Sequence, residues 1–142
     1  MTTEVLINDG GAPARIMNLG AANVALEAGL FVDINSSGKI IAMADDQKDG
    51  TNQAQAAGLG VLLVDAVSGE PTSIVTGKGI VCNVQSVASL AAGDELVIDG
   101  AGKLEKPTND DTDRVVAIAL AATFAGVGTD GVANNFTKVL LI

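Results

Sequence analysis

The segment LEAGLFVDINSSGK, which occupies Leu26–Lys39, returns sixty-four positions later as LAAGDELVIDGAGK at Leu90–Lys103. Six of the fourteen positions are identical, whereas ordinary residue frequencies would give roughly one or two matches. The chain therefore contains one supersecondary unit that is used twice, and the character of this unit decides the fold.

The shared residues are those that a β-hairpin requires. Gly29 and Gly93 can supply the positive φ of a turn that enters a strand. Apolar residues then alternate toward one face: Val32 and Ile34 in the first copy, Leu96 and Ile98 in the second. Each copy continues with an Asx residue and, three positions later, Gly (Asn35–Gly38 and Asp99–Gly102), which is typical of a type I turn closing a hairpin with a bulge. The repeat predicts a hairpin, not a reaction centre.

Composition extends this prediction to the whole chain. The 142 residues suit one domain, and 48% of them are hydrophobic. Because the aromatic residues are three Phe with no Trp or Tyr, the core must be built from Val, Leu, Ile and Ala. Seventeen Gly against three Pro favour short strands and many turns. We therefore expect an all-β fold, a small barrel or sandwich built from two similar hairpin-containing halves, with an extended N-terminal arm.

The expected organisation is an arm at residues 1–20 and a single β domain at 21–142, with an internal repeat at about 21–84 and 85–142. The apolar run 59–64 has its counterpart at 115–120, and a final strand spans 136–142. Gly77 and Gly79 indicate a bulge or a barrel corner. Helix remains an alternative at Asn52–Ala57 and at Ala117–Ala125, where alanine is dense.

Charge and termini restrict the class of partner. Eight Lys and Arg against seventeen Asp and Glu give a net charge of −9, which would repel a phosphate backbone, so no nucleic-acid partner is expected. The N-terminal residues have neither a basic region nor a long apolar run, so we expect no signal peptide, no membrane partner and synthesis in the cytoplasm.

No set of residues is suited to catalysis, and we expect neither an enzyme nor a cofactor. Histidine is absent, and Cys82 is alone, so it is expected to be a buried hydrophobic residue. The GxGxxG match at 126–131 lacks the following helix and strand of a dinucleotide site. The residues at 45–56 resemble a calcium loop but end in Ala56 where Glu is required. The acidic residues of 110–113 could hold a hard cation such as calcium or could simply be solvated.

The N-terminal arm is the expected contact region. It has two apolar patches on either side of the turn-rich segment Asn8–Pro13. Residues 1–20 are either a frayed terminus or an arm that lies on a neighbouring subunit. The second interpretation assigns partner contacts to six residues: Val5, Leu6, Ile7, Arg15, Ile16 and Met17.

The second copy of the hairpin, followed by VVAIAL at 115–120 and VLLI at 139–142, resembles the small capsid decoration or cement proteins of tailed bacteriophages. The resemblance covers 87–142 best, is weaker over 24–84, and has no motif in the arm. It implies a non-enzymatic β protein that binds the outer surface of an expanded icosahedral head, often as a homotrimer, and fastens neighbouring subunits of the major capsid protein. The expected location is then the exterior of the virion capsid, after synthesis in the host cytoplasm.

Other functions remain as alternatives. A β module that recognises a glycan or receptor would ordinarily carry Trp or Tyr for stacking on sugars, and this chain has neither. A metal-dependent module would depend on the acidic loop at 110–113. A structural subunit of a non-viral assembly would need no further sequence feature.

Overall fold

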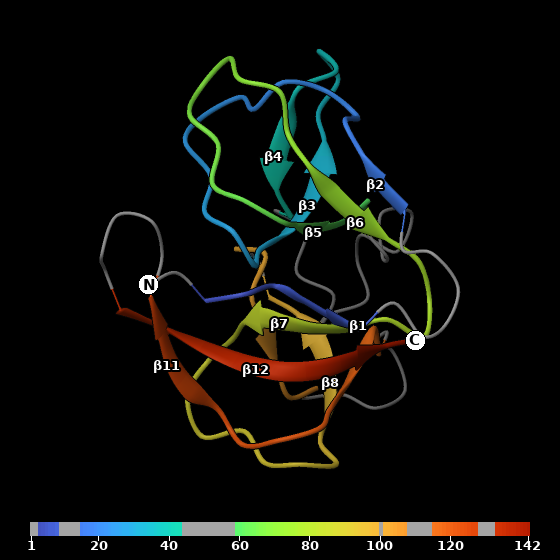
Figure 1. Ribbon diagram of the computed structural model, residues 1–142, viewed down its shortest axis with the longest axis vertical. Coiled ribbons are helices and arrows are strands. Elements are labelled where there is room, and N and C mark those ends of the chain that lie inside the picture. Colours follow the sequence, from blue (N-terminus) through green and yellow to red (C-terminus); the bar gives the residue numbers. More distant parts are fainter. Residues whose placement is uncertain (1–2, 9–14, 44–58, 100, 108–114, 128–132) are drawn as a thin grey trace.

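The computed structural model describes residues 3–8, 15–43, 59–99, 101–107, 115–127 and 133–142. These residues form twelve strands in two antiparallel sheets and no helix, as Figure 1 shows. The prediction of an all-β fold is confirmed. Of the two architectures expected, the arrangement is that of a small sandwich, because neither sheet closes into a barrel.

Five strands form the first sheet, in the order β2 (Arg15–Met17), β6 (Ile74–Thr76), β5 (Gly60–Leu62), β3 (Phe31–Ile34) and β4 (Ile40–Ala42). The second sheet runs in the order β1 (Leu6–Asn8), β7 (Val81–Gln85), β12 (Ala133–Leu141), β10 (Ala117–Ala119), β8 (Glu95–Ile98) and β9 (Leu104–Glu105), and β11 (Phe124–Val127) pairs with the start of β12. The N-terminal segment thus supplies one edge strand to each sheet: β1 to the second sheet and β2 to the first.

Both sheets have the same topology. The order β2-β6-β5-β3-β4 of the first sheet corresponds strand by strand to β7-β12-β10-β8-β9 of the second. The register corresponds as well, because Ile16 lies opposite Val75 just as Val81 lies opposite Leu140. A single parallel bridge, between Ala22 and Ile40, recurs in the second half between Ser86 and Leu104. The duplication therefore includes a whole five-stranded sheet and not only a hairpin.

The hydrogen bonds of the turns recur at equivalent positions in the two halves. The amide of Gly29 donates to the carbonyl of Leu62 at 2.8 Å, and the amide of Gly93 donates to that of Ala119 at 2.8 Å. At the hairpin tips, the side-chain oxygen of Asn35 accepts from the amide of Lys39 at 2.9 Å, and that of Asp99 accepts from Lys103 at 2.9 Å.

Both tips end in a glycine with positive φ, 76° at Gly38 and 78° at Gly102. In the first tip, the amide of Gly38 also donates to the carbonyl of Asn35 at 3.0 Å. In the first tip these features are those of a type I turn followed by a glycine bulge, so the predicted turn is confirmed there. The second turn includes Gly100, which lies outside the described residues.

The boundary between the halves differs from the expected one. The chain leaves the first sheet after Thr76 and enters the second at Val81, so β7 lies wholly in the second half, and β2 from the expected arm belongs to the first. Gly77 and Gly79, with φ of 136° and 76°, lie in this passage and form the corner between the sheets.

The helical alternative at Ala117–Ala125 is wrong, whereas Asn52–Ala57 lies outside the described residues. Ala117–Ala119 form β10, which is paired on both sides by β12 and β8. Pairing within the sheet overrides the helical propensity of alanine. The expected counterpart of 59–64 is displaced by one residue, because the amide of Leu59 donates to Val32 as that of Val116 donates to Leu96.

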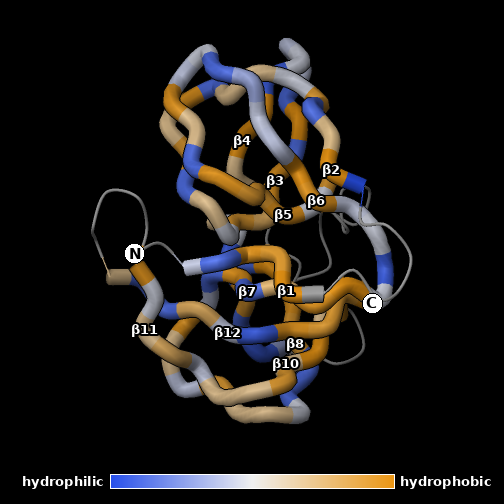
Figure 2. The backbone as a smooth tube through the Cα atoms, in the orientation of Figure 1, coloured by the Kyte–Doolittle hydropathy of each residue, from blue (hydrophilic) through white to orange (hydrophobic). Residues whose placement is uncertain are grey.

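Buried apolar residues form two clusters, and the larger one contains residues of both sheets. In Figure 2, orange segments of the two sheets lie close together where the sheets pack. The smaller apolar cluster belongs to the first half and includes Val32, Ile40 and Ile74. The larger cluster is built mainly from the second half but contains Phe31, Val61 and Val75 of the first sheet.

The hairpin tips differ in their surroundings, and this accounts for one departure from the predicted alternation. Val32, Leu96 and Ile98 are fully buried, but Ile34 is 38% exposed. The second tip packs against the first sheet, where the carbonyl of Gly102 accepts from the amide of Phe31 at 2.9 Å. Gly38, at the first tip, is exposed. Of the two equivalent turns, the first is therefore a solvent-exposed tip and the second is part of the contact between the halves.

A matched pair of variants measures this difference. A Cβ at Gly102 would lie 2.6 Å from the carbonyl oxygen of Phe31, whereas a Cβ at Gly38 would meet nothing within 4 Å. Gly38→Ala should lower the free energy of unfolding by about 1–2 kcal/mol, the cost of left-handed backbone alone. Gly102→Ala should cost at least ~2 kcal/mol more, as measured by urea denaturation. Equal losses would contradict the packing of the second tip.

Candidate interaction edge

The six residues predicted to bind a partner lie on two strands with different surroundings. Val5 is buried in the larger apolar cluster, and Leu6 packs against it. Ile7, Ile16 and Met17 are exposed to 45%, 52% and 42%, and Arg15 is also exposed. The structure does not bring the six together, because β1 is an edge of the second sheet and β2 an edge of the first.

Strand β1 is held by its own chain. It pairs antiparallel with β7, with Leu6 opposite Cys82. Asn83 makes two hydrogen bonds to the residues just before β1. Its backbone amide donates to the carbonyl of Val5 at 2.7 Å, and its Nδ2 donates to the carbonyl of Glu4 at 2.7 Å. The amide of Thr3 also donates to the carbonyl of Val127 at 2.9 Å. Residues 3–8 are therefore not a frayed terminus.

Cys82 lies at the centre of this pairing, on the strand that β1 covers. Its side chain is fully buried in the larger apolar cluster, as expected from the sequence. Burial raises the pKa of the thiol to about 11. Because the thiolate is the reactive form, Cys82 is inert in the native fold.

Strand β2 occupies the position in the first sheet that β7 occupies in the second. The sequence Ile16-Met17-Asn18 of the first half corresponds to Val81-Cys82-Asn83 of the second. No strand lies beyond β2 among the described residues, whereas β1 lies beyond β7. This explains why Met17 is 42% exposed and its counterpart Cys82 is fully buried.

Asn18 is a candidate residue that the sequence analysis missed. It is exposed, and its Oδ1 accepts from the amide of Gly20 at 3.1 Å. Its counterpart Asn83 is the residue that grips β1. The signal in the sequence was the correspondence of IMN at 16–18 with VCN at 81–83, which becomes apparent only when the duplication is extended beyond the hairpin.

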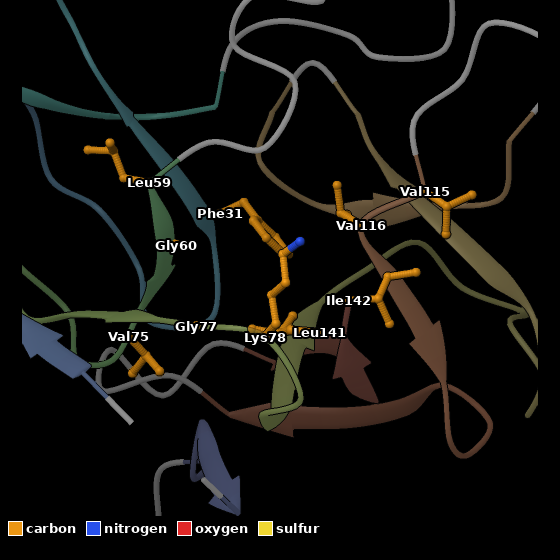
Figure 3. Close-up of a pocket in the computed structure, with 10 residues that line it drawn as sticks. All are labelled: Phe31, Leu59, Gly60, Val75, Gly77, Lys78, Val115, Val116, Leu141 and Ile142. Atoms are coloured by element: carbon orange, nitrogen blue, oxygen red, sulfur yellow. The ribbon is translucent and has the colours of Figure 1, made fainter. Parts of the chain in front are cut away.

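A hollow of about 530 Å³ lies where the two sheets meet. Figure 3 shows Val75 of the first sheet on one side and Val116 and Ile142 of the second half on the other. Lys78 is the one charged side chain among the residues that line it. Ligand pockets combine an apolar wall with several convergent polar groups, and this hollow has no such set.

A second hollow, of about 390 Å³, is lined by Glu27, Asp65 and Glu70. These carboxylates accept hydrogen bonds within the fold, Glu27 from the side-chain nitrogen of Gln85 at 3.0 Å and Asp65 from the amide of Ala28 at 2.7 Å. Across the described ranges, no three His, Cys, Asp or Glu side chains are grouped so as to hold a metal ion. The acidic loop at 110–113 and the calcium-like segment at 45–56 lie outside those ranges, as does part of the GxGxxG match.

In the comparison with known proteins, no protein-family model and no curated protein matches the chain. Within the described part of the chain, no helix is long and apolar enough to cross a membrane. The candidate site is therefore defined by the chain's own geometry: the exposed outer edge of β2 together with the residue that follows the strand, Ile16–Asn18, which we name the β2 edge.

The duplicated asparagines give a direct test of how β1 is held. Asn83→Ala removes a buried hydrogen bond to Glu4 and should lower the free energy of unfolding by about 1–2 kcal/mol. Asn18→Ala is the matched control, and it should remain within ~0.5 kcal/mol of the wild type because Asn18 is exposed. Urea denaturation measures both variants. If the two losses are equal, Asn83 does not secure β1.

The buried thiol gives a second test. With a pKa of about 11, only about one Cys82 thiol in a thousand is ionised at pH 8. Labelling by a disulfide reagent should therefore be slow in the native chain, and deletion of residues 2–8, which uncovers β7, should accelerate it at least about tenfold. Unfolded chain in urea provides the fully reactive reference. An unchanged rate after the deletion would show that β1 does not protect Cys82.

Proposed function

We propose that this chain is a structural capsid decoration protein, which binds the outer surface of an icosahedral phage head and stabilises contacts between subunits of the major capsid protein. The observation that carries the proposal is the β2 edge, an exposed strand edge with apolar side chains on a β-sheet whose core is built mainly from aliphatic residues. Ile16 and Met17 are 52% and 42% exposed, whereas their counterparts in the second sheet, Val81 and Cys82, are half-buried and fully buried. Exposed strand edges with apolar side chains are sites of association with other chains.

Two features of the chain agree with such a role. The resemblance of 87–142 to decoration proteins concerns the hairpin and the strands that follow it, and these residues form most of the second sheet. A net charge of −9 favours solubility at the high concentrations at which a head is decorated. Many copies, each held by a small contact, then stabilise a shell together.

The structure changes which residues can make the contact. Val5 and Leu6 pack against the chain's own core, so their proposed contact with a capsid is replaced by a role in holding β1. Ile7, Arg15, Ile16 and Met17 remain exposed. Deletion of 2–20 would remove an edge strand from each sheet and would damage the fold, so point substitutions are the better test.

The first experiment uses expanded heads of the phage whose genome carries this reading frame, prepared without the chain. Added chain should bind at a fixed ratio to the major capsid protein and raise the temperature at which the heads rupture. Unexpanded heads should not bind it. Failure to bind expanded heads, or a reading frame remote from any capsid gene, would contradict the proposed function. Mass measurement in solution tests the homotrimer that the resemblance implies.

A pair of double variants tests which surface makes the contact. Ile16→Ser with Met17→Ser removes the exposed apolar side chains of β2 and should weaken binding to heads at least about tenfold. The control is Val64→Ser with Val67→Ser, which changes side chains that are 52% and 56% exposed in the connection between β5 and β6. The control should bind as the wild type does; equal losses in both variants would place the contact elsewhere.

A further inference from the structure

The β2 edge and the outer edge of β7 are equivalent positions in the duplicated sheets, and one of them shows how an occupant is bound. On β7, the occupant is the segment 3–8, whose strand β1 pairs antiparallel with a register shift between Leu6 and Asn8, and whose Val5 is 2% exposed. On β2, the described residues supply no strand. The pairing of β1 with β7 is therefore a template for what the β2 edge can receive.

The template identifies the groups that face outward. On β7, the amide of Asn83 donates to Val5 and the amide of Gln85 donates to Gly29, both away from β12, whereas the carbonyl of Ile80 accepts from Leu141 on β12. Odd-numbered residues of β7 thus direct their backbone groups to the outer edge. Alternate residues of a strand point their backbone groups in opposite directions.

The same register applies to β2. Because Ile16 lies opposite Val75 as Val81 lies opposite Leu140, Ile16 directs its N–H and C=O groups outward. Asn18 follows the last residue of β2, and the same alternation continued past Met17 directs its groups outward as well. Met17, like Cys82, directs its groups to the neighbouring strand in the sheet. Nδ2 of Asn18 has no acceptor among the described residues, whereas the equivalent atom of Asn83 donates to Glu4.

The occupant cannot be β1 of a second copy without loss elsewhere. Each chain has one segment 3–8, and it is used on β7, where Val5 and Leu6 complete the larger apolar cluster. Its transfer to another copy would uncover Cys82, which is fully buried. No other strand of the described residues is left to pair with the outer edge of β2, and a strand from a different chain would fill the same position.

We propose that the β2 edge receives an extended segment of another protein, antiparallel to β2, with apolar side chains at alternate positions and a backbone carbonyl that accepts from Nδ2 of Asn18. This inference rests on the proposed function, whose partner would supply the segment. The contact with this partner is then strand addition, in which main-chain hydrogen bonds supply affinity, and not apolar contact alone.

The test uses a peptide as the probe for such a segment. An acetylated and amidated peptide with the sequence of residues 3–9, TEVLIND, is titrated into the isotopically labelled full chain. The amide resonances of Ile16 and Asn18 should shift on binding, and those of Val81 and Asn83 should not, because β1 already covers them. The proposal would be overturned if the resonances of Ile16 and Asn18 did not shift up to about 5 mM peptide, a concentration at which even millimolar binding would be detected.

Two variants separate main-chain pairing from apolar contact. Ile16→Pro removes an outward N–H but leaves the ladder with β6, since proline is tolerated on an edge strand when its nitrogen faces solvent. It should weaken peptide binding at least about tenfold. Ile16→Thr keeps the N–H and should bind within about threefold of the wild type. Binding that survives Ile16→Pro would overturn the proposal.

Modified peptides give the same test without altering the fold. On β1, the carbonyl of Val5 faces β7, so N-methylation at Val5 blocks an inward-facing group, and N-methylation at Leu6 is the control that faces away. The first should abolish binding and the second should preserve it. Equal binding of both peptides would overturn strand addition, as would a concentration-dependent dimer of the chain that protects Ile16, because a second copy would then be the occupant.

The two proposals can fail separately. The peptide experiments involve no heads, so heads that bind neither wild type nor variant would contradict the proposed function and leave the β2 edge established by the peptide. Heads that bind Ile16→Pro as tightly as the wild type would leave decoration standing and overturn the strand-addition contact.

Discussion

An edge strand of a β-sheet presents unpaired N–H and C=O groups. Because this chain contains two equivalent sheets, it has such an edge at the same position in each of them, on β7 and on β2. On β7 these groups are paired by the segment 3–8, in which the carbonyls of Val5 and Glu4 accept from the backbone and the side chain of Asn83. On β2 the described residues provide no such strand. The asymmetry between these edges accounts for the burial of Cys82 and for the exposure of Met17.

A second asymmetry joins the halves. The face of the first sheet that carries Phe31 and Val75 packs into the larger apolar cluster, and the tip at Gly102 binds the amide of Phe31. The equivalent tip at Gly38 remains in solvent. One supersecondary unit therefore performs two tasks, because what surrounds each copy differs although the turn chemistry does not.

The sequence predicted the hairpins and the β class well, because glycine with positive φ and an Asx residue at a turn act locally. It did not predict the extent of the duplication. Beyond the hairpin, the halves share few identities, and the equivalence of Ile16 with Val81 depends on pairing with β6 and β12, which are distant in the chain. The helical alternative at 117–125 failed for the same reason, since strand pairing and not alanine content decides β10. The apolar patches of the N-terminal segment were recognised from the sequence, but whether a patch faces the chain's own core depends on tertiary contacts.

The outer edge of β7 is covered and the equivalent edge of β2 is open, and amide hydrogen exchange of the free full chain tests this difference most directly. The amide of Asn83, which donates to Val5, should exchange at least about a hundredfold more slowly than that of Asn18. Met17 and Cys82, whose amides face neighbouring strands within their sheets, should both be protected and serve as internal references. Equal protection of Asn18 and Asn83 would contradict the account, because it would mean that the β2 edge is already covered in the isolated chain.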